Sequence, residues 1–168
     1  MTVIFHVDDL LGGCVLSEAL EDLYEVLIIK YKRVKVTRGK IHPYLGMIMN
    51  LQHPGIVMIG NPGYMSDLVK EYGESTPMTT PADEKSDAKR FHSFAAKLLY
   101  LSKRTRPDIL TLVAFLTTRV QSPIEDDRAK LHRGMGYIIR TIGLSLTLEV
   151  EGPISDSICG HIICHSHF

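Results

Sequence analysis

The amino-acid sequence predicts an α+β fold, with small antiparallel β-hairpins at the N-terminal end and a mainly helical C-terminal half. Several short runs rich in β-branched residues, each bounded by a turn, occur among the first 60 positions. Apolar residues at helical spacing dominate from about residue 61 to residue 143. The 168 residues are 45% hydrophobic, which allows a packed core in one domain or two small ones.

Residues 3–11 organise the N-terminal half. One apolar run leads into Asp8 and Asp9 and a second run leaves them, so we expect a β-hairpin with both aspartates at its tip. Carboxylates a few ångströms apart repel each other unless a cation lies between them. Their oxygen atoms suit Mg²⁺, so Asp8 and Asp9 are candidate catalytic and metal-binding residues. The alternative is an ordinary Asp-Asp turn that binds no metal.

The next segments alternate helix and strand signals. Apolar spacing predicts an amphipathic helix over residues 17–32, with Ser17 as its N-cap. Residues 34–36 alternate as a short strand. Residues 44–49 and 56–59 predict a second β-hairpin around the turn signal of residues 53–55, and Gly46 inside it indicates a bulge or a close backbone approach.

The C-terminal half reads as a series of helices. Asn61 caps the first, with Pro62 at its first position and Gly73 as its stop, and a linker is expected over residues 74–88. Further helices are predicted over residues 91–102 and from Pro107. The last begins with a capping box at residues 122–125 and is ended by Gly143. Residues 144–150 alternate as a half-buried strand.

Charge is balanced overall but unevenly placed. The formal net charge is zero, so bulk charge does not indicate a nucleic-acid-binding protein. Residues 30–40 contain six cations and no acidic residue, namely Lys30, Lys32, Arg33, Lys35, Arg38 and Lys40. A second basic group comprises Lys97, Lys103, Arg104 and Arg106. For each group the alternative is a solvated face without a partner.

Other features bear on location and metals. No secretory signal pattern follows Met1 and no apolar stretch approaches the length of a membrane span, so we expect an intracellular protein with no membrane partner. The tail is dense in cysteine and histidine. It could bind zinc, although the spacing fits no common finger, and the alternative is a tail read in a shifted frame or an eroded transposon end. Four isolated histidines are expected at the surface or in turns, namely His42, His53, His92 and His132.

The order of these motifs resembles the reverse transcriptase of copia-type LTR retrotransposons, over about residues 2–150. Residues 5–11, Phe-His-Val-Asp-Asp-Leu-Leu, are similar to the polymerase palm motif, usually Tyr-Val-Asp-Asp between apolar residues. The further matches are Tyr44-Leu45-Gly46 at the primer grip, Thr80-Pro81 in the linker, residues 94–101 followed by Thr105-Arg106-Pro107-Asp108-Ile109, and Ser122-Pro123.

The resemblance implies RNA-directed DNA synthesis by Mg²⁺-dependent nucleotidyl transfer, with a primer–template and dNTPs as partners and Asp8 and Asp9 at the metal site. Tyr44, Leu45 and Gly46 would contact the primer, and the basic run from Lys30 to Lys40 would lie along duplex phosphates, which set affinity without sequence preference. The implied parts are a partial palm over 1–60, a thumb-like helix and linker over 61–88, a helical thumb and connection over 89–150, and a divergent tail over 151–168.

The chain also departs from the family pattern. His6 stands where the family has tyrosine, and the family's further catalytic aspartate belongs to a segment upstream of this hairpin. We therefore expect a fragment that is inactive as an isolated chain and that depends on the rest of a polyprotein for activity. The alternative is a nucleic-acid-binding module without catalysis, or a transposon relic.

Overall fold

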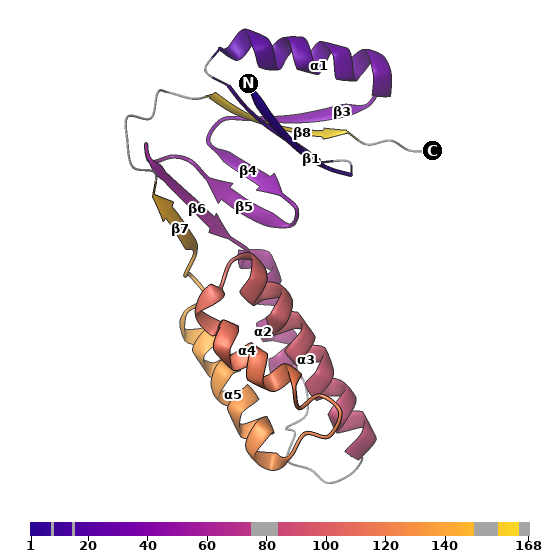
Figure 1. Cartoon of the computed structure of the whole chain (residues 1–168), viewed down its shortest axis with the longest axis vertical. Coiled ribbons are helices and arrows are strands. Elements are labelled where there is room, and N and C mark those ends of the chain that lie inside the picture. The colour runs from indigo at the N-terminus through magenta and orange to yellow at the C-terminus, as the bar shows by residue number, and fades with distance from the viewer. Residues whose placement is uncertain (8, 15, 75–83, 150–157, 165–168) are drawn as a thin grey trace. The chain divides into compact units, whose positions relative to one another are not determined.

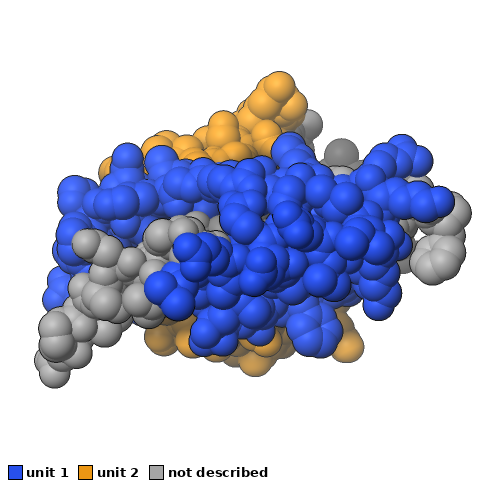
Figure 2. All heavy atoms as spheres, turned by 90° about the horizontal axis from the view of Figure 1, so that it is seen from above, with its two compact units in different colours: residues 1–59, 147–168 blue, residues 60–146 orange. Residues whose placement is uncertain are grey.

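The computed structural model confirms the α+β class. It describes residues 1–7, 9–14, 16–74, 84–149 and 158–164 (Figure 1). The chain divides into two compact units, which Figure 2 colours separately. Unit 1 comprises residues 1–59 and 147–168 and holds most of the strands, and unit 2 comprises residues 60–146 and holds all helices but the first. The predicted segments 61–88 and 89–150 thus fall mainly in unit 2, and the predicted tail contributes a strand to unit 1.

The first sheet of unit 1 has the strand order β1-β2-β8-β3. Its members are β1 (Thr2–His6), β2 (Asp9–Cys14), β3 (Val34–Arg38) and β8 (Ile158–Cys164). All neighbouring strands pair antiparallel. The last strand of the sequence therefore lies between two strands from its first quarter (Figure 1).

The predicted N-terminal hairpin is present. β1 and β2 pair from Thr2↔Gly13 to His6↔Asp9, so residues 7 and 8 connect them. The expectation that both aspartates lie at the tip is wrong for Asp9, because Asp9 is the first residue of β2 and pairs with His6. Asp8 lies outside the described residues. Val7 has a φ of 53°, a left-handed conformation that a β-branched residue rarely adopts.

Helix α1 (Ser17–Tyr31) packs on one face of the first sheet, as its apolar stripe predicts. The buried side chain of Leu27 contacts Leu10 of β2 and Val34 and Val36 of β3. The predicted cap is wrong by one residue, because the helix begins at Ser17 and Leu16 occupies the N-cap position without a side-chain hydrogen bond.

The second sheet has the order β4-β5-β6-β7. It contains β4 (Ile41–Tyr44), β5 (Met47–Asn50), β6 (Ile56–Gly60) and β7 (Leu146–Glu149). The predicted pairing across residues 53–55 is confirmed as β5 and β6. Gly46 does not mark a bulge: Leu45 and Gly46, with φ values of 49° and 76°, form a two-residue turn that splits the predicted strand into β4 and β5. Pro43 fits because β4 is an edge strand.

Unit 2 is built from α2 (Pro62–Glu74), α3 (Glu84–Arg104), the 3₁₀ turn η1 (Pro107–Ile109), α4 (Leu110–Thr117) and α5 (Glu125–Arg140). The predicted start of α2 is confirmed, since the Tyr64 amide donates to Asn61 Oδ1 at 3.3 Å. The core buries one side of each helix and consists of Met65, Leu68, Phe91, Phe94, Ala95, Leu98, Leu101, Ile109, Val113, Leu116, Leu131, Met135 and Ile138.

Several predicted helix ends in unit 2 are wrong, and one of them is the stop at Gly143, because α5 already ends at Arg140. Helix α2 continues through Gly73 to Glu74, and α3 begins at Glu84, so the helix takes the last part of the predicted linker. The rest of that linker, residues 75–83, lies outside the described residues. Helix α5 begins at Glu125, because the Asp127 carboxylate accepts the backbone N–H of Ile124 at 3.1 Å and so fixes Ile124, not Ser122, as the N-cap.

The turn at Gly46 gives a direct test of the second sheet. Gly46→Ala is expected to lower the free energy of unfolding by about 1 kcal/mol, because alanine is strained at positive φ. Gly13→Ala is the matched control in the same unit, because a Cβ at Gly13 would meet nothing within 4 Å. It should be neutral or stabilising. Urea unfolding followed by circular dichroism measures both, and equal effects would contradict the turn.

Candidate nucleic-acid interface

The two faces of the first sheet differ in chemistry. Leu10, Val34 and Val36 face α1, where they pack on Leu27. Because successive residues of a strand point to opposite faces, Asp9 and Lys35 lie on the face away from α1. Asp9 is half-buried and Lys35 is exposed. The sheet therefore presents a predicted metal ligand and a predicted phosphate-binding cation on one face.

Asp9 and Lys35 form no ion pair with each other. One strand lies between β2 and β3, so their backbones are separated by about 9.6 Å, twice the spacing of neighbouring strands. The ammonium group of Lys35 thus stays available to an anion that approaches this face.

The basic run from Lys30 to Lys40 is divided by the fold. Lys30 belongs to the last turn of α1, with its ammonium group 5.3 Å from the Tyr31 ring centroid. Arg38 forms a forked ion pair with Glu21, with N–O distances of 2.7 Å to 3.1 Å, and its guanidinium group lies 5.4 Å from the Tyr24 ring centroid. This pairing raises the pKa of Arg38 and ties its charge to α1. Lys40 is exposed between β3 and β4.

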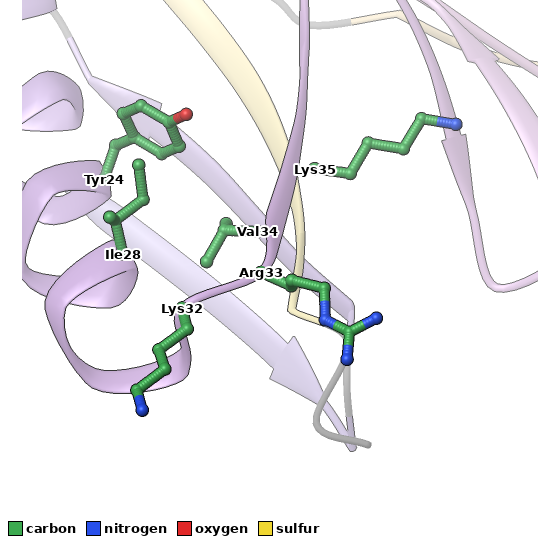
Figure 3. A pocket seen from close by; sticks show the side chains of 6 residues that line it. All are labelled: Tyr24, Ile28, Lys32, Arg33, Val34 and Lys35. Atoms are coloured by element: carbon green, nitrogen blue, oxygen red, sulfur yellow. The ribbon is translucent and has the colours of Figure 1, made fainter.

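Lys32, Arg33 and Lys35 come together around one surface pocket of about 410 Å³. Tyr24, Ile28 and Val34 supply its apolar lining. In Figure 3 these apolar side chains lie between α1 and β3, whereas the charged ends of the three cations point in different directions. Within the described part of the chain, none of the three forms an ion pair.

The bend between α1 and β3 holds these cations at the surface. Lys32 has a φ of 59° and closes the helix by donating its backbone N–H to Ile28 O at 2.9 Å. The Arg33 N–H then donates to Tyr31 O at 2.6 Å. A non-glycine residue at positive φ is uncommon, and here it turns the chain sharply enough to bring β3 back under the helix.

The predicted primer-contact residues are only partly accessible. Tyr44 is 8% exposed and shares the inner face of β4 with His42, which is 0% exposed. Leu45 and Gly46 form the turn at the end of that strand and are the accessible part of the motif. The expectation that His42 lies at the surface is wrong: its Nε2 contacts Gly39 O at 2.8 Å and so fixes the bend between β3 and β4.

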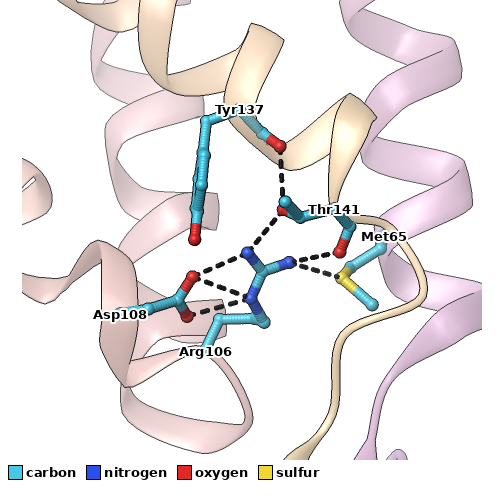
Figure 4. A network of polar contacts seen from close by, with 5 residues as sticks. All are labelled: Met65, Arg106, Asp108, Tyr137 and Thr141. Carbon is cyan, nitrogen blue, oxygen red and sulfur yellow. Dashed lines mark hydrogen bonds and ion pairs between the residues drawn. The ribbon is translucent and has the colours of Figure 1, made fainter.

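The structure also divides the second basic group. Lys97 pairs with Glu71, and Lys103 and Arg104 are exposed at the end of α3. Arg106 is 1% exposed, so it belongs to no solvated face. Its guanidinium donates to Asp108 at 2.7 Å to 3.2 Å, to Thr141 O at 3.0 Å and to Thr141 Oγ1 at 2.7 Å (Figure 4). The burial of this arginine was not apparent from the sequence, because charge alone indicates exposure.

The predicted metal sites receive no direct support. In the ranges that the structure describes, no three histidine, cysteine or acidic side chains lie close enough together to hold a metal ion. Asp8, His165 and His167 lie outside those ranges. Cys159, His161 and Cys164 belong to β8, whose backbone pairs with β2 and β3. None of the described helices is both long and apolar enough to cross a lipid bilayer.

Comparisons of this chain with protein-family models, with curated proteins and with solved structures each found no match. The function must therefore be argued from the residues and their arrangement.

The Arg106–Asp108 pair predicts acid sensitivity in unit 2. The hydrogen bond from Arg106 lowers the pKa of Asp108 in the folded state, so this carboxylate stabilises the fold above its unfolded pKa of about 3.9. That stabilisation is lost as pH falls through the folded value. Urea unfolding between pH 6 and pH 3 should therefore show a shallower loss of stability for Asp108→Asn than for the unaltered chain.

The matched control is Asp67→Asn, at an exposed carboxylate of α2 that has no ion pair with another described residue. This variant should keep the acid dependence of the unaltered chain. An unchanged dependence in Asp108→Asn would show that the Arg106–Asp108 pair does not act as inferred.

Proposed function

We propose that this chain is the palm-hairpin and thumb-like part of a retrotransposon reverse transcriptase of the copia type, acting inside the cell, and that its own residues bind the primer–template duplex. The observation that carries the proposal is the shared sheet face of Asp9 and Lys35, opposite α1. A templated polymerase needs carboxylates and phosphate-binding cations on one accessible surface.

The arrangement of the cations favours an extended polyanion over a small anion. The charged ends of the three cations at the pocket, Lys32, Arg33 and Lys35, point in different directions (Figure 3). They therefore do not converge on one phosphate. A nucleic-acid backbone offers a row of phosphates, about one charge per 1.7 Å of duplex axis, and diverging cations can each meet a different one. Tyr24 and Ile28 add apolar lining to the same pocket.

The carboxylate hairpin fits magnesium by its chemistry. Mg²⁺ takes oxygen ligands, keeps several waters and commonly uses one or two protein carboxylates plus substrate phosphates. Asp8 and Asp9 would provide those carboxylates, and the bound ion would stabilise the charge that develops during transfer from a dNTP. In the family a further aspartate comes from a segment upstream of the hairpin. We therefore infer that these 168 residues bind duplex but do not extend a primer without a complementing segment of the polyprotein.

A binding module without catalysis is the alternative, and it uses the same cations. The two proposals predict different results when a complementing palm segment is added to the chain and primer extension is measured. Under the polymerase proposal, adding that segment restores Mg²⁺-dependent extension that Asp9→Asn abolishes. Under the alternative, the segment adds nothing beyond duplex binding.

Charge reversal at the pocket tests duplex binding. The combined variant Lys32→Glu, Arg33→Glu and Lys35→Glu should weaken binding of an RNA–DNA primer–template, and it should reduce the slope of log K against log salt by about 2 to 3, near 0.9 per phosphate contact. Fluorescence anisotropy across a salt series measures both quantities.

The control variant combines Lys89→Glu, Lys103→Glu and Arg104→Glu. It changes the same residue types and the same net charge at exposed positions of α3 in unit 2. Its effect on binding should be smaller. Equal losses in the two variants would show that net charge, and not this surface, governs binding.

Primer extension tests the catalytic part of the proposal. The purified chain is expected to give no extension product with Mg²⁺ and dNTPs, although it binds the same duplex, because two-metal transfer needs the further carboxylate. The anisotropy assay on the same preparation confirms that the protein is folded and competent to bind. Extension that disappears in Asp9→Asn would show that the chain holds a complete site.

A further inference from the structure

The position of β8 creates a strand-binding slot in unit 1. β8 pairs with β2 from Asp9↔Ile163 to Cys14↔Ile158, and with β3 from Val34↔Cys164 to Arg38↔Gly160. β2 and β3 are not neighbours in the sheet, so only β8 joins their hydrogen-bond ladders. Each of them therefore offers β8 a row of backbone donors and acceptors along its inner edge.

The strands on either side of this slot, β2 and β3, and the helix that covers it, α1, all come from the first quarter of the chain. Leu27 of α1 contacts Leu10 on β2 and Val34 and Val36 on β3. These contacts tie the flanking strands to one helix by side chains that do not belong to β8. The main-chain hydrogen bonds that the slot makes with its strand do not depend on the copy of the chain that supplies the strand.

The pairing between β2 and β8 is rich in glycine. Gly12 stands opposite Gly160, and Gly13 stands opposite Cys159. A glycine pair has no side chains to fix the register or to pack across the ladder. Glycine-rich strands are weakly specified in their pairing and are prone to exchange between molecules.

We propose that β8 exchanges between two copies of this chain, so that the slot of each copy accepts Ile158–Cys164 of the other. The product is a strand-swapped dimer in which every main-chain pair of the first sheet is kept. A second copy is the partner that fits, because it carries the same strand with its glycine at the same register. The inference is independent of the proposed polymerase function.

Mixed-chain disulfide trapping tests the exchange. Leu11 and His161 are opposite each other across β2 and β8, at a separation that suits a disulfide. In a full-length background with the three cysteines changed to serine, one chain carries Leu11→Cys and a second carries His161→Cys. The two are unfolded in urea, refolded together at rising concentration and oxidised. We expect a disulfide-linked 11–161 dimer that increases with concentration, identified by peptide mass spectrometry.

The control uses the same Leu11→Cys chain with an Ile4→Cys chain. Ile4 and Leu11 are opposite each other in the β1–β2 hairpin, which closes within one chain. The 11–161 dimer should exceed the 11–4 dimer several-fold. A repeat with Leu10→Cys and Ile162→Cys, the next pair in the register, guards against a local folding defect.

Two results would overturn the proposal. If neither β2–β8 mixture exceeds the hairpin control while Leu11→Cys and His161→Cys in one chain form their internal disulfide, β8 stays in its own sheet. If that internal disulfide also fails to form, β8 does not occupy the slot.

Discussion

The main-chain hydrogen bonds of β8 are the interaction on which unit 1 depends. They connect the hairpin that carries Asp9 to the strand that carries Lys35. Apart from β8, these strands are linked through the contacts of Leu10, Val34 and Val36 with Leu27 of α1. The apolar core beneath α1 is small, with Leu27 as its buried centre. Unit 2 contrasts with this, since its four α-helices and η1 together bury thirteen core residues. Backbone hydrogen bonds between strands therefore contribute more to holding unit 1 together than they do in unit 2.

That constraint shapes the candidate interface. When a helix covers one face of a sheet, every second residue of each strand points to the opposite, uncovered face. In the first sheet these residues include Asp9 on β2 and Lys35 on β3. The bend at Lys32 adds two more cations at the end of the helix. Because Glu21 holds Arg38, the charges free to meet a polyanion are fewer than the basic run contains.

Arg106 differs from these exposed cations because it is buried and its charge is bound within the protein. Removing a guanidinium group from water costs several kcal/mol, which only dense hydrogen bonding offsets. Asp108 and Thr141 supply those acceptors, and the Tyr137 ring centroid lies 5.5 Å from the guanidinium carbon. The residue therefore joins the start of η1 to the end of α5 and is structural, although its charge suggested a surface role.

The sequence by itself determined the local elements. The 3.6-residue spacing located α1, Asn61 and Pro62 located the start of α2, and two short apolar runs on either side of Asp8 and Asp9 located the N-terminal hairpin. These signals lie within a few residues of the structure that they produce. Only the tertiary structure decided which strands became neighbours and which charges were buried. β8 pairs with strands more than 100 positions away, and the burial of His42 and Arg106 depends on elements that pack on them, so no local pattern encodes either outcome.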